Sequence, residues 1–325
     1  MKEIIIDINE ANQRLDKLLI KLLSQCSKSF IYKQIRKKNI VLNDSKATGN
    51  EILKLGDSVK IYFSDETFEK FSAPKEEISL PIVPERFEVI YEDSDIILVN
   101  KWQGVLSQKA KDTDISMNEY VLSYLYNKGY ISLESLKSFK PSISNRLDRN
   151  TSGILIAGKS LNGLQVMAKA LKDRTIEKYY YAVVKGELKE GLSLKGYISK
   201  DEETNKVTVL DSPSFDADKS FKPIETSYEV VKSSKDITLL KVHLITGKTH
   251  QIRAHLSYIN HPIIGDNKYG DKEINKRFYD NYNVKYQLLH AVELAFPDDF
   301  SLANVRGKAF TAKVPETMKR VIEAI

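Results

Sequence analysis

The stretch Asn145-Arg146-Leu147-Asp148-Arg149-Asn150-Thr151-Ser152-Gly153 places one carboxylate between two arginines and ends in a turn before the apolar run Ile154-Leu155-Ile156. A nearby positive charge favours the ionised form of an aspartate, and an ionised carboxylate can attack an electrophilic carbon. Asp148 is therefore a candidate nucleophile. Taken by itself, however, a charge cluster of this kind is more often a solvated group of surface salt bridges than a catalytic site.

Length and composition indicate an ordinary globular chain. The 325 residues, of which 42% are hydrophobic, can bury cores for two or three domains. The single cysteine, Cys26, excludes internal disulfides and cysteine-rich zinc sites, and charged residues interrupt any apolar signal segment at the N-terminus. No run approaches the roughly 18 apolar residues that a membrane helix needs. We therefore expect a cytoplasmic protein that does not enter a membrane, with a monomer as the default state.

Positive charge is concentrated at the N-terminal end of the chain. Residues 1–63 contain 12 Lys or Arg against 7 Asp or Glu, so they carry +5 of the formal net charge of +6. Helical apolar spacing over 15–23 and 30–35, followed by strand-like segments at 40–43 and 58–63, predicts two short helices and a small sheet. A basic stripe suited to a phosphate backbone runs along the second predicted helix and into the loop after it, although a solvated helix face has the same pattern. It comprises Lys28, Lys33, Arg36, Lys37 and Lys38.

A domain boundary follows this basic region. Residues 64–86 combine acidic residues with three prolines and show no sustained periodicity, which predicts an extended linker. Strand-like segments at 87–91 and 96–99 then begin a body that is rich in strands.

Two further segments contain candidate site residues. The strand-like segment 178–184 includes Tyr180, and a tyrosine there can face a flat ligand, although tyrosines are common in half-buried strands for packing alone. Arg253 falls near the start of a predicted helix, where the helix dipole disfavours an arginine, so we expect a carboxylate partner, Asp148. Three histidines lie at intervals of five and six residues, which do not stack metal ligands on one helical face, so we expect no metal site. They are His250, His255 and His261.

Three groups of motifs together resemble the RluA-type pseudouridine synthases over residues 87–300. They are VNKWQGVLSQ; SNRLDRNTSGILI with KYYYAVVKG; and TGKTHQIRAHLSYINHPIIGDNKYG followed by LLHAVELAFP. Several long motifs in this order are far more specific than a single Arg-Leu-Asp. The basic region likewise resembles the S-four RNA-binding domain, whose second helix and following loop contact folded RNA. Its matching segments are RLDKLL, SKSFIYKQIRKKNIVLN and LKLGDSVKIYF.

The resemblance implies an α+β architecture and an RNA pseudouridine synthase activity. We expect an RNA-binding domain of residues 1–63, a linker of residues 64–86, and a catalytic domain of residues 87–325. The catalytic domain is expected to have a mixed, largely antiparallel sheet with flanking helices.

The resemblance also assigns roles to individual residues. It implies that Asp148 is the catalytic aspartate, Tyr180 the tyrosine of a Lys-x-Tyr-x-Ala pattern, Arg253 the salt-bridge partner of the aspartate, and Ile264 an apolar active-site residue. Two positions depart from the family: Asn145 stands where His is usual, and Trp102 where Pro is frequent.

The implied reaction breaks the bond from ribose to the uracil nitrogen and rejoins the base through its carbon 5, which needs no cofactor. Asp148 acts either by attacking the anomeric carbon or by assisting loss of the base. Tyr180 is suited to stack on the uracil and is a candidate general base. Arg253 is a poor general base, because its high pKa keeps the guanidinium protonated. A uridine in folded RNA must leave its stack, and Arg146 is the side chain expected to take its place.

Large-subunit ribosomal RNA is the expected substrate, with transfer RNA as the alternative. A second function consistent with the basic residues 1–63 is a noncatalytic RNA-binding or ribosome-assembly factor, although Asp148, Tyr180 and Arg253 together argue against it. A glycosidase needs two carboxylates, and no convincing second acid lies near these motifs.

Overall fold

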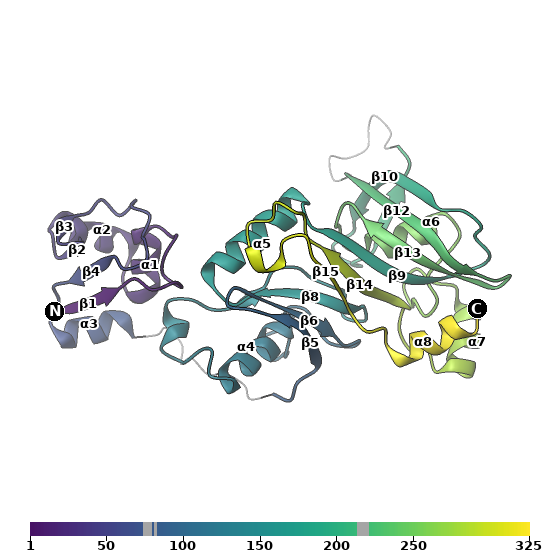
Figure 1. The fold of residues 1–325 in the computed structure, drawn as a ribbon, viewed down its shortest axis with the longest axis horizontal. Coiled ribbons are helices and arrows are strands. Elements are labelled where there is room, and N and C mark those ends of the chain that lie inside the picture. The colour runs from purple at the N-terminus through teal and green to yellow at the C-terminus, as the bar shows by residue number, and fades with distance from the viewer. Residues whose placement is uncertain (74–79, 81–82, 213–220) are drawn as a thin grey trace.

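The computed structural model describes residues 1–73, 80, 83–212 and 221–325, which form two separate sheets (Figure 1). The smaller sheet is antiparallel, with strand order β1-β4-β2-β3. Its elements are β1 (Lys2–Ile5), α1 (Leu15–Leu22), α2 (Lys28–Arg36), β2 (Ile40–Leu42), β3 (Ser45–Lys46) and β4 (Ser58–Ile61). The two predicted helices and the strands at 40–43 and 58–63 are confirmed, whereas the edge strand β1, half of it charged, was not predicted.

The small sheet and its two helices enclose a core of their own. Leu15, Leu18 and Leu19 of α1 pack with Ile31 and Ile35 of α2, and these side chains are almost completely buried. Because the apolar residues of α2 face inward, its basic residues face solvent. Lys28, Lys33, Arg36, Lys37 and Lys38 are all exposed.

The prediction of an extended linker over residues 64–86 is wrong for the first part of that segment, which forms helix α3 (Asp65–Ser72). The side chain of Ser64 accepts a hydrogen bond from a backbone N–H of the first turn and caps the helix. Phe68 and Phe71 then pack on the core of the small sheet, so tertiary contact stabilises a helix that lacks a clear apolar period. Residues 74–79 and 81–82 of the predicted linker lie outside the described residues.

The larger sheet has eleven strands, in the order β11-β10-β12-β13-β9-β14-β8-β6-β5, with β7 beside β8 and β15 beside β14. Its pairs in the described residues are antiparallel except β14 with β8, so the predicted α+β fold with a mixed, largely antiparallel sheet is confirmed. The strands are β5 (Phe87–Glu92), β6 (Ile96–Lys101), β7 (Ser142–Ile143), β8 (Ser152–Gly158), β9 (Glu177–Lys185), β10 (Leu192–Lys200), β11 (Val207–Leu210), β12 (Lys222–Ser233), β13 (Ile237–Leu244), β14 (Leu289–Ala295) and β15 (Ala309–Thr311).

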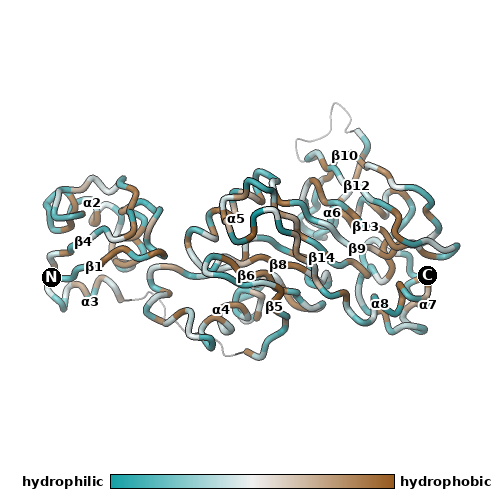
Figure 2. The backbone as a smooth tube through the Cα atoms, viewed as in Figure 1, coloured by the Kyte–Doolittle hydropathy of each residue, from teal (hydrophilic) through white to brown (hydrophobic). Residues whose placement is uncertain are grey.

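Helices cover both faces of this sheet. One face of β6 and β8 packs on α5 and the other on α4, which explains why apolar residues run consecutively over 96–99 in β6 and 154–157 in β8 (Figures 1 and 2). Similarly, β9 lies between α6 on one face and α7 with α8 on the other. The helices are α4 (Met117–Asn127), α5 (Leu161–Asp173), α6 (Gln251–Tyr258), α7 (Lys272–Tyr282) and α8 (Glu316–Glu323), with 3-10 turns at Ser135–Lys137 and Ala303–Val305. In the described parts of the chain, no helix is both long and apolar enough to cross a bilayer.

Gly153 allows β8 to lie directly beside β14. Its φ is +109°, and a Cβ at this position would overlap the carbonyl oxygen of Ala291 in the parallel neighbour. We expect Gly153→Ala to destabilise the protein by about 2 to 3 kcal/mol, from backbone strain and overpacking together. Urea unfolding will measure the loss. Gly129→Ala is the matched control, because Gly129 has a φ of +74° with no atom near a new Cβ, and an equal loss in both variants would exclude the steric contribution.

Candidate active site

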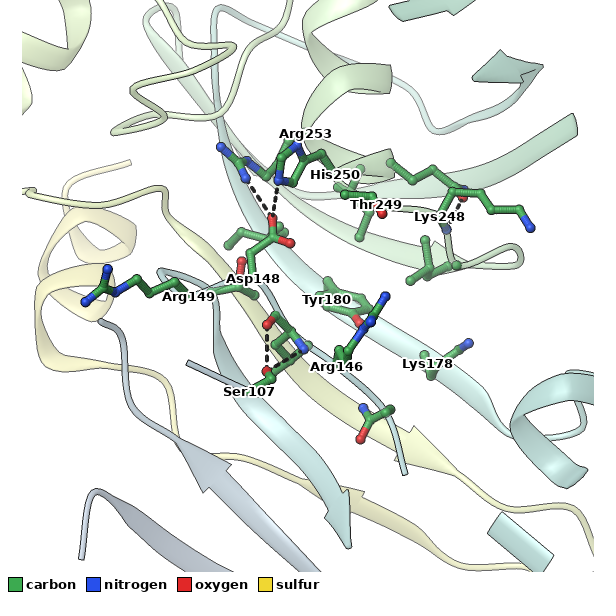
Figure 3. Close-up of a pocket in the computed structure, with 18 of the residues that line it drawn as sticks. Ser107, Arg146, Asp148, Arg149, Lys178, Tyr180, Lys248, Thr249, His250 and Arg253 are labelled. Atoms are coloured by element: carbon green, nitrogen blue, oxygen red, sulfur yellow. Dashed lines mark hydrogen bonds and ion pairs between the residues drawn. The ribbon is translucent and has the colours of Figure 1, made fainter. Parts of the chain in front are cut away.

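A cavity of about 870 Å³ opens where the loop before β8 faces α6 and the middle of β9 (Figure 3). Four residues singled out in the sequence line this cavity, although they come from three distant segments. They are Arg146, Asp148, Tyr180 and Arg253. The volume is typical of a site for a small molecule or one nucleotide-sized group.

Arg253 forms the predicted ion pair with Asp148, its Nη1 donating to Oδ2 at 2.7 Å (Figure 3). Its Nε and Nη2 donate to the two carboxylate oxygens of Asp266, at 2.7 and 2.9 Å. A bidentate bond of this kind fixes the plane of the guanidinium and so aims Nη1 at Asp148. Within the described residues, the other oxygen of Asp148, Oδ1, accepts no hydrogen bond.

Asp266 is a site residue that the sequence reasoning missed. Its side chain is 0% exposed and also accepts the backbone N–H groups of Lys268 and Tyr269. Burial opposes its charge, but the bonds from Arg253 and these N–H groups outweigh it and lower the pKa of Asp266. Burial likewise opposes the charge of Arg253, and the two carboxylates raise the pKa of that guanidinium. The sequence did contain a signal for Asp266. It is the aspartate of the GDNKYG motif, and Arg253 at the start of the preceding predicted helix needed acidic partners.

Hydrogen bonds on both sides hold the loop that carries Asp148. The Ser107 hydroxyl accepts the N–H of Leu147 at 3.0 Å and donates to the carbonyl of the same residue at 2.6 Å. The side-chain oxygen of Asn145 accepts the N–H of Ile156 at 2.8 Å. Asn145 therefore positions the loop by hydrogen bonding.

Lys101, the last residue of β6, lies completely buried beneath the same loop. Its Nζ donates to the carbonyls of Trp102, Val105 and Arg149, at 2.9 to 3.0 Å. Burial lowers the pKa of Lys101 to about 7, and the negative charge of Asp148 opposes that shift. Trp102 is 45% exposed, so this loop accommodates a tryptophan by turning its side chain to solvent, while its carbonyl accepts the bond from Lys101.

Tyr180 faces the cavity from the middle of β9. The predicted alternation is confirmed, because Tyr180, Ala182 and Val184 pack on the face towards α6 while Val183 packs on the opposite face. Burial and the negative charge of Asp148 raise the pKa of Tyr180 well above its usual value. A hydroxyl that stays protonated is a poor general base, so this environment favours the stacking role for Tyr180 over the proton-accepting one.

The structure does not bring Ile264 to the cavity. Its side chain is 0% exposed and packs with Val183 and Leu239 on the face of β9 that is turned away from Tyr180. The preceding residue, Ile263, belongs instead to the cluster that contains Tyr180. Ile263 and Ile264 therefore pack on opposite faces of β9. Because both residues are isoleucine, the sequence does not show which of them lies on the same face as Tyr180.

His250 also lies beside the catalytic candidates, and its part in the site was not predicted. Its Nε2 is 4.0 Å from Oδ2 of Asp148, and its Nδ1 is 2.9 Å from the hydroxyl of Tyr269. Burial lowers the pKa of His250, with Arg253 acting in the same direction and Asp148 against it. Among the described residues, no group of three His, Cys, Asp or Glu side chains is arranged to hold a metal ion.

The cavity as a whole is strongly electropositive. Among the described residues that line it, nine are lysine or arginine and only Asp148 is acidic. A cavity with this charge suits a polyanion. The basic residues of α2 and the turn after it do not line the cavity and lie on the smaller sheet unit.

Comparison with known proteins gives matches along most of the chain. Residues 95–258 match the family model described as RNA pseudouridylate synthase. The chain is 33% identical to an uncharacterized RNA pseudouridine synthase of Mycoplasma genitalium, over 88% of this chain and 86% of that protein. It is 28% identical to a ribosomal large subunit pseudouridine synthase C of Vibrio vulnificus, over 99% and 96% of the two chains.

A solved structure has the same fold. The chain is similar to the human RNA pseudouridylate synthase domain containing 4, with a TM-score of 0.58 at 19% identity. The likeness covers 73% of this chain and 92% of the human one.

Proposed function

The chain belongs to the RNA pseudouridylate synthase family and is an isomerase, and from this premise we propose that it converts specific uridines of large-subunit ribosomal RNA into pseudouridine with Asp148 as nucleophile. The observation that carries the proposal is the carboxylate of Asp148 inside an electropositive cavity, with one oxygen bound by Arg253 and the other accepting no hydrogen bond from the described residues. Relatives named for the large ribosomal subunit support ribosomal over transfer RNA.

In the proposed reaction, Oδ1 of Asp148 attacks carbon 1′ of the ribose, and the bond from that carbon to N1 of uracil breaks. The freed base rotates in the cavity, stacked on Tyr180. Its carbon 5 then forms a bond to carbon 1′ and displaces Asp148. Carbon 5 loses one proton and N1 gains one, so the reaction is balanced without a cofactor. Arg253 stabilises the carboxylate before and after its attack.

The target uridine must enter the cavity from a stacked position, and we propose that Arg146 fills the space it leaves. Arg146 is exposed beside Asp148, and its guanidinium makes one hydrogen bond among the described residues, a long one of 3.5 Å to Gln108. A side chain held so loosely is free to insert between bases.

Arg146→Ala is expected to slow turnover on folded RNA more than on an unstructured RNA with the same target uridine. Unstacking costs a few kcal/mol only where the base is stacked, so only there is the inserted side chain needed. Single-turnover rates on the two RNAs measure the difference. Arg149→Ala is the control, because it removes the same charge from the other side of Asp148 and should slow both reactions equally. Equal losses for Arg146→Ala as well would reject the insertion role.

We further propose that residues 1–63, with α3 packed on their core, form an RNA-binding domain of the S-four type that precedes the catalytic domain of residues 87–325. The separate core of the small sheet and the exposed basic side chains of α2 support this division. The protein would act as a cytoplasmic monomer.

The substrate proposal can be tested with purified protein and RNA transcripts labelled with tritium at carbon 5 of uridine. Because carbon 5 exchanges its hydrogen for the bond to ribose, each turnover releases one tritium to water. We expect release from large-subunit ribosomal RNA and none from a transfer RNA pool. Release from the transfer RNA pool alone would overturn the choice of substrate.

A further inference from the structure

Lys178 is a cation of the cavity for which the described residues provide no partner. It precedes Tyr180 by two residues on β9, so the two side chains lie on the same face of the strand, and both line the cavity (Figure 3). Within the described residues, Nζ of Lys178 makes no hydrogen bond and no ion pair. Its neighbour Tyr180, by contrast, is packed into the core.

A second cation, Arg174, lies near Lys178. Arg174 ends α5 in the left-handed conformation, with a φ of +59°, and this turn leads the chain from the helix into β9 at the rim of the cavity. Burial, and after it the positive charge of Arg174, lowers the pKa of Lys178. Two neighbouring cations without an acid raise the free energy of the unliganded protein, and an anion between them would relieve that cost.

The loop between β13 and α6 closes the opposite side of this position. A Cβ added to Gly247 would lie 3.9 Å from Nζ of Lys178, so the amine lies against this loop, and the next residue, Lys248, also lines the cavity. Asp148, the one acid among the described residues that line the cavity, is bound to Arg253 and so does not neutralise Lys178. A bound anion could therefore supply the negative charge that faces Lys178.

We propose that Lys178 and Arg174 bind a backbone phosphate of the RNA strand next to the uridine that enters the cavity. The inference rests on the proposed function for the identity of the polyanion. Two residues along a strand span roughly 6 to 7 Å, so an amine at Lys178 and a base stacked on Tyr180 are separated by a distance on the scale of one nucleotide. Lysine suits this role because its ammonium binds phosphate as a point charge.

The test is the salt dependence of binding to oligouridylate, a probe that needs no target sequence. Lys178→Gln is expected to weaken binding by roughly tenfold, as for loss of a charge-assisted hydrogen bond. It should also reduce the slope of log affinity against log salt by about 0.7, the value for one phosphate contact on a single strand. Lys178→Arg should recover most of the affinity.

Lys169→Gln is the matched control, because Lys169 is an exposed lysine of α5 that does not line the cavity. It should leave both affinity and slope unchanged. If Lys178→Gln binds with the same affinity and slope as Lys169→Gln, the phosphate site is rejected. If Lys178→Gln fails to fold, Arg174→Gln replaces it, because Arg174 is exposed. A reduced slope of log affinity against log salt would then support the phosphate site, and a slope equal to that of Lys169→Gln would reject it.

A second measurement identifies the phosphate. On a short RNA that the wild type modifies, an uncharged methylphosphonate in place of one flanking phosphate should weaken binding by the wild type clearly more than binding by Lys178→Gln, which retains only the Arg174 contact to that phosphate. If the methylphosphonate weakens binding by the wild type and by Lys178→Gln to the same extent at each of the two flanking positions, the proposal is overturned. Because these readouts are affinities, a protein that binds RNA in this way but releases no tritium would contradict the proposed function and leave the phosphate site intact.

Discussion

Replacement of Asp148 by asparagine is expected to reduce pseudouridine formation on the order of 10³-fold or more while leaving RNA affinity unchanged. The amide has nearly the same shape and still accepts the hydrogen bond from Arg253, but it cannot attack carbon 1′. The nine cations that line the cavity remain in place, so the attraction to phosphate persists.

Tritium release under single-turnover conditions and oligouridylate affinity together test this expectation. Asp112→Asn is a suitable control, because Asp112 is an exposed acid outside the cavity. A rate near that of the wild type would reject Asp148 as nucleophile. A parallel loss of affinity and rate would assign Asp148 to RNA recognition instead.

Arg253→Met is expected to destabilise the protein by about 3 to 5 kcal/mol and to abolish activity. The substitution leaves the buried carboxylate of Asp266 without its bidentate partner, and an unpaired buried charge carries a cost of this size. It also releases Asp148 from the contact that orients it. Urea unfolding at neutral pH measures the loss of stability, and tritium release measures the loss of activity.

Asp266→Asn added to Arg253→Met separates these two effects. The amide removes the buried charge but still accepts the backbone N–H groups of Lys268 and Tyr269, so much of the lost stability should return. Activity should stay low, because Asp148 still lacks its partner. Recovery of activity along with stability would show that Arg253 acts through the fold and not through Asp148.

The stability of the Arg253→Met variant should also depend on pH in a defined direction. In the wild type, folding lowers the pKa of Asp266, so its contribution is present at neutral pH and is lost as the pH falls through the folded value. Without Arg253, burial raises the pKa of this carboxyl above the unfolded value. The destabilisation relative to wild type should therefore shrink from about pH 7 to about pH 5.

The parts of the fold that could be predicted are those in which local pattern and tertiary packing agree. The apolar repeats of α1 and α2 face their own core, and β8 is apolar over 154–157 because helices cover both of its faces. The Asp148–Arg253 pair could also be predicted, because an arginine at the start of a helix needs a nearby carboxylate.

The parts that could not be predicted depend on contacts between distant segments. Helix α3 is stabilised by two phenylalanines, Phe68 and Phe71, that pack on the core of the small sheet, and two apolar side chains in eight residues are too few to predict a helix from the sequence. Asp266 and Lys101 look like ordinary surface charges until the fold buries them against Arg253 and the loop of Asp148. For Ile264, two successive isoleucines on opposite faces leave the choice to the tertiary structure.

The most direct test is a pseudouridine map of total RNA from cells that lack this protein and are complemented with either the wild type or Asp148→Asn. The account predicts that discrete sites in large-subunit ribosomal RNA disappear in the deletion strain, return with the wild type and stay absent with the variant. An unchanged map, with both proteins expressed, would contradict it and favour a noncatalytic role in RNA binding or ribosome assembly.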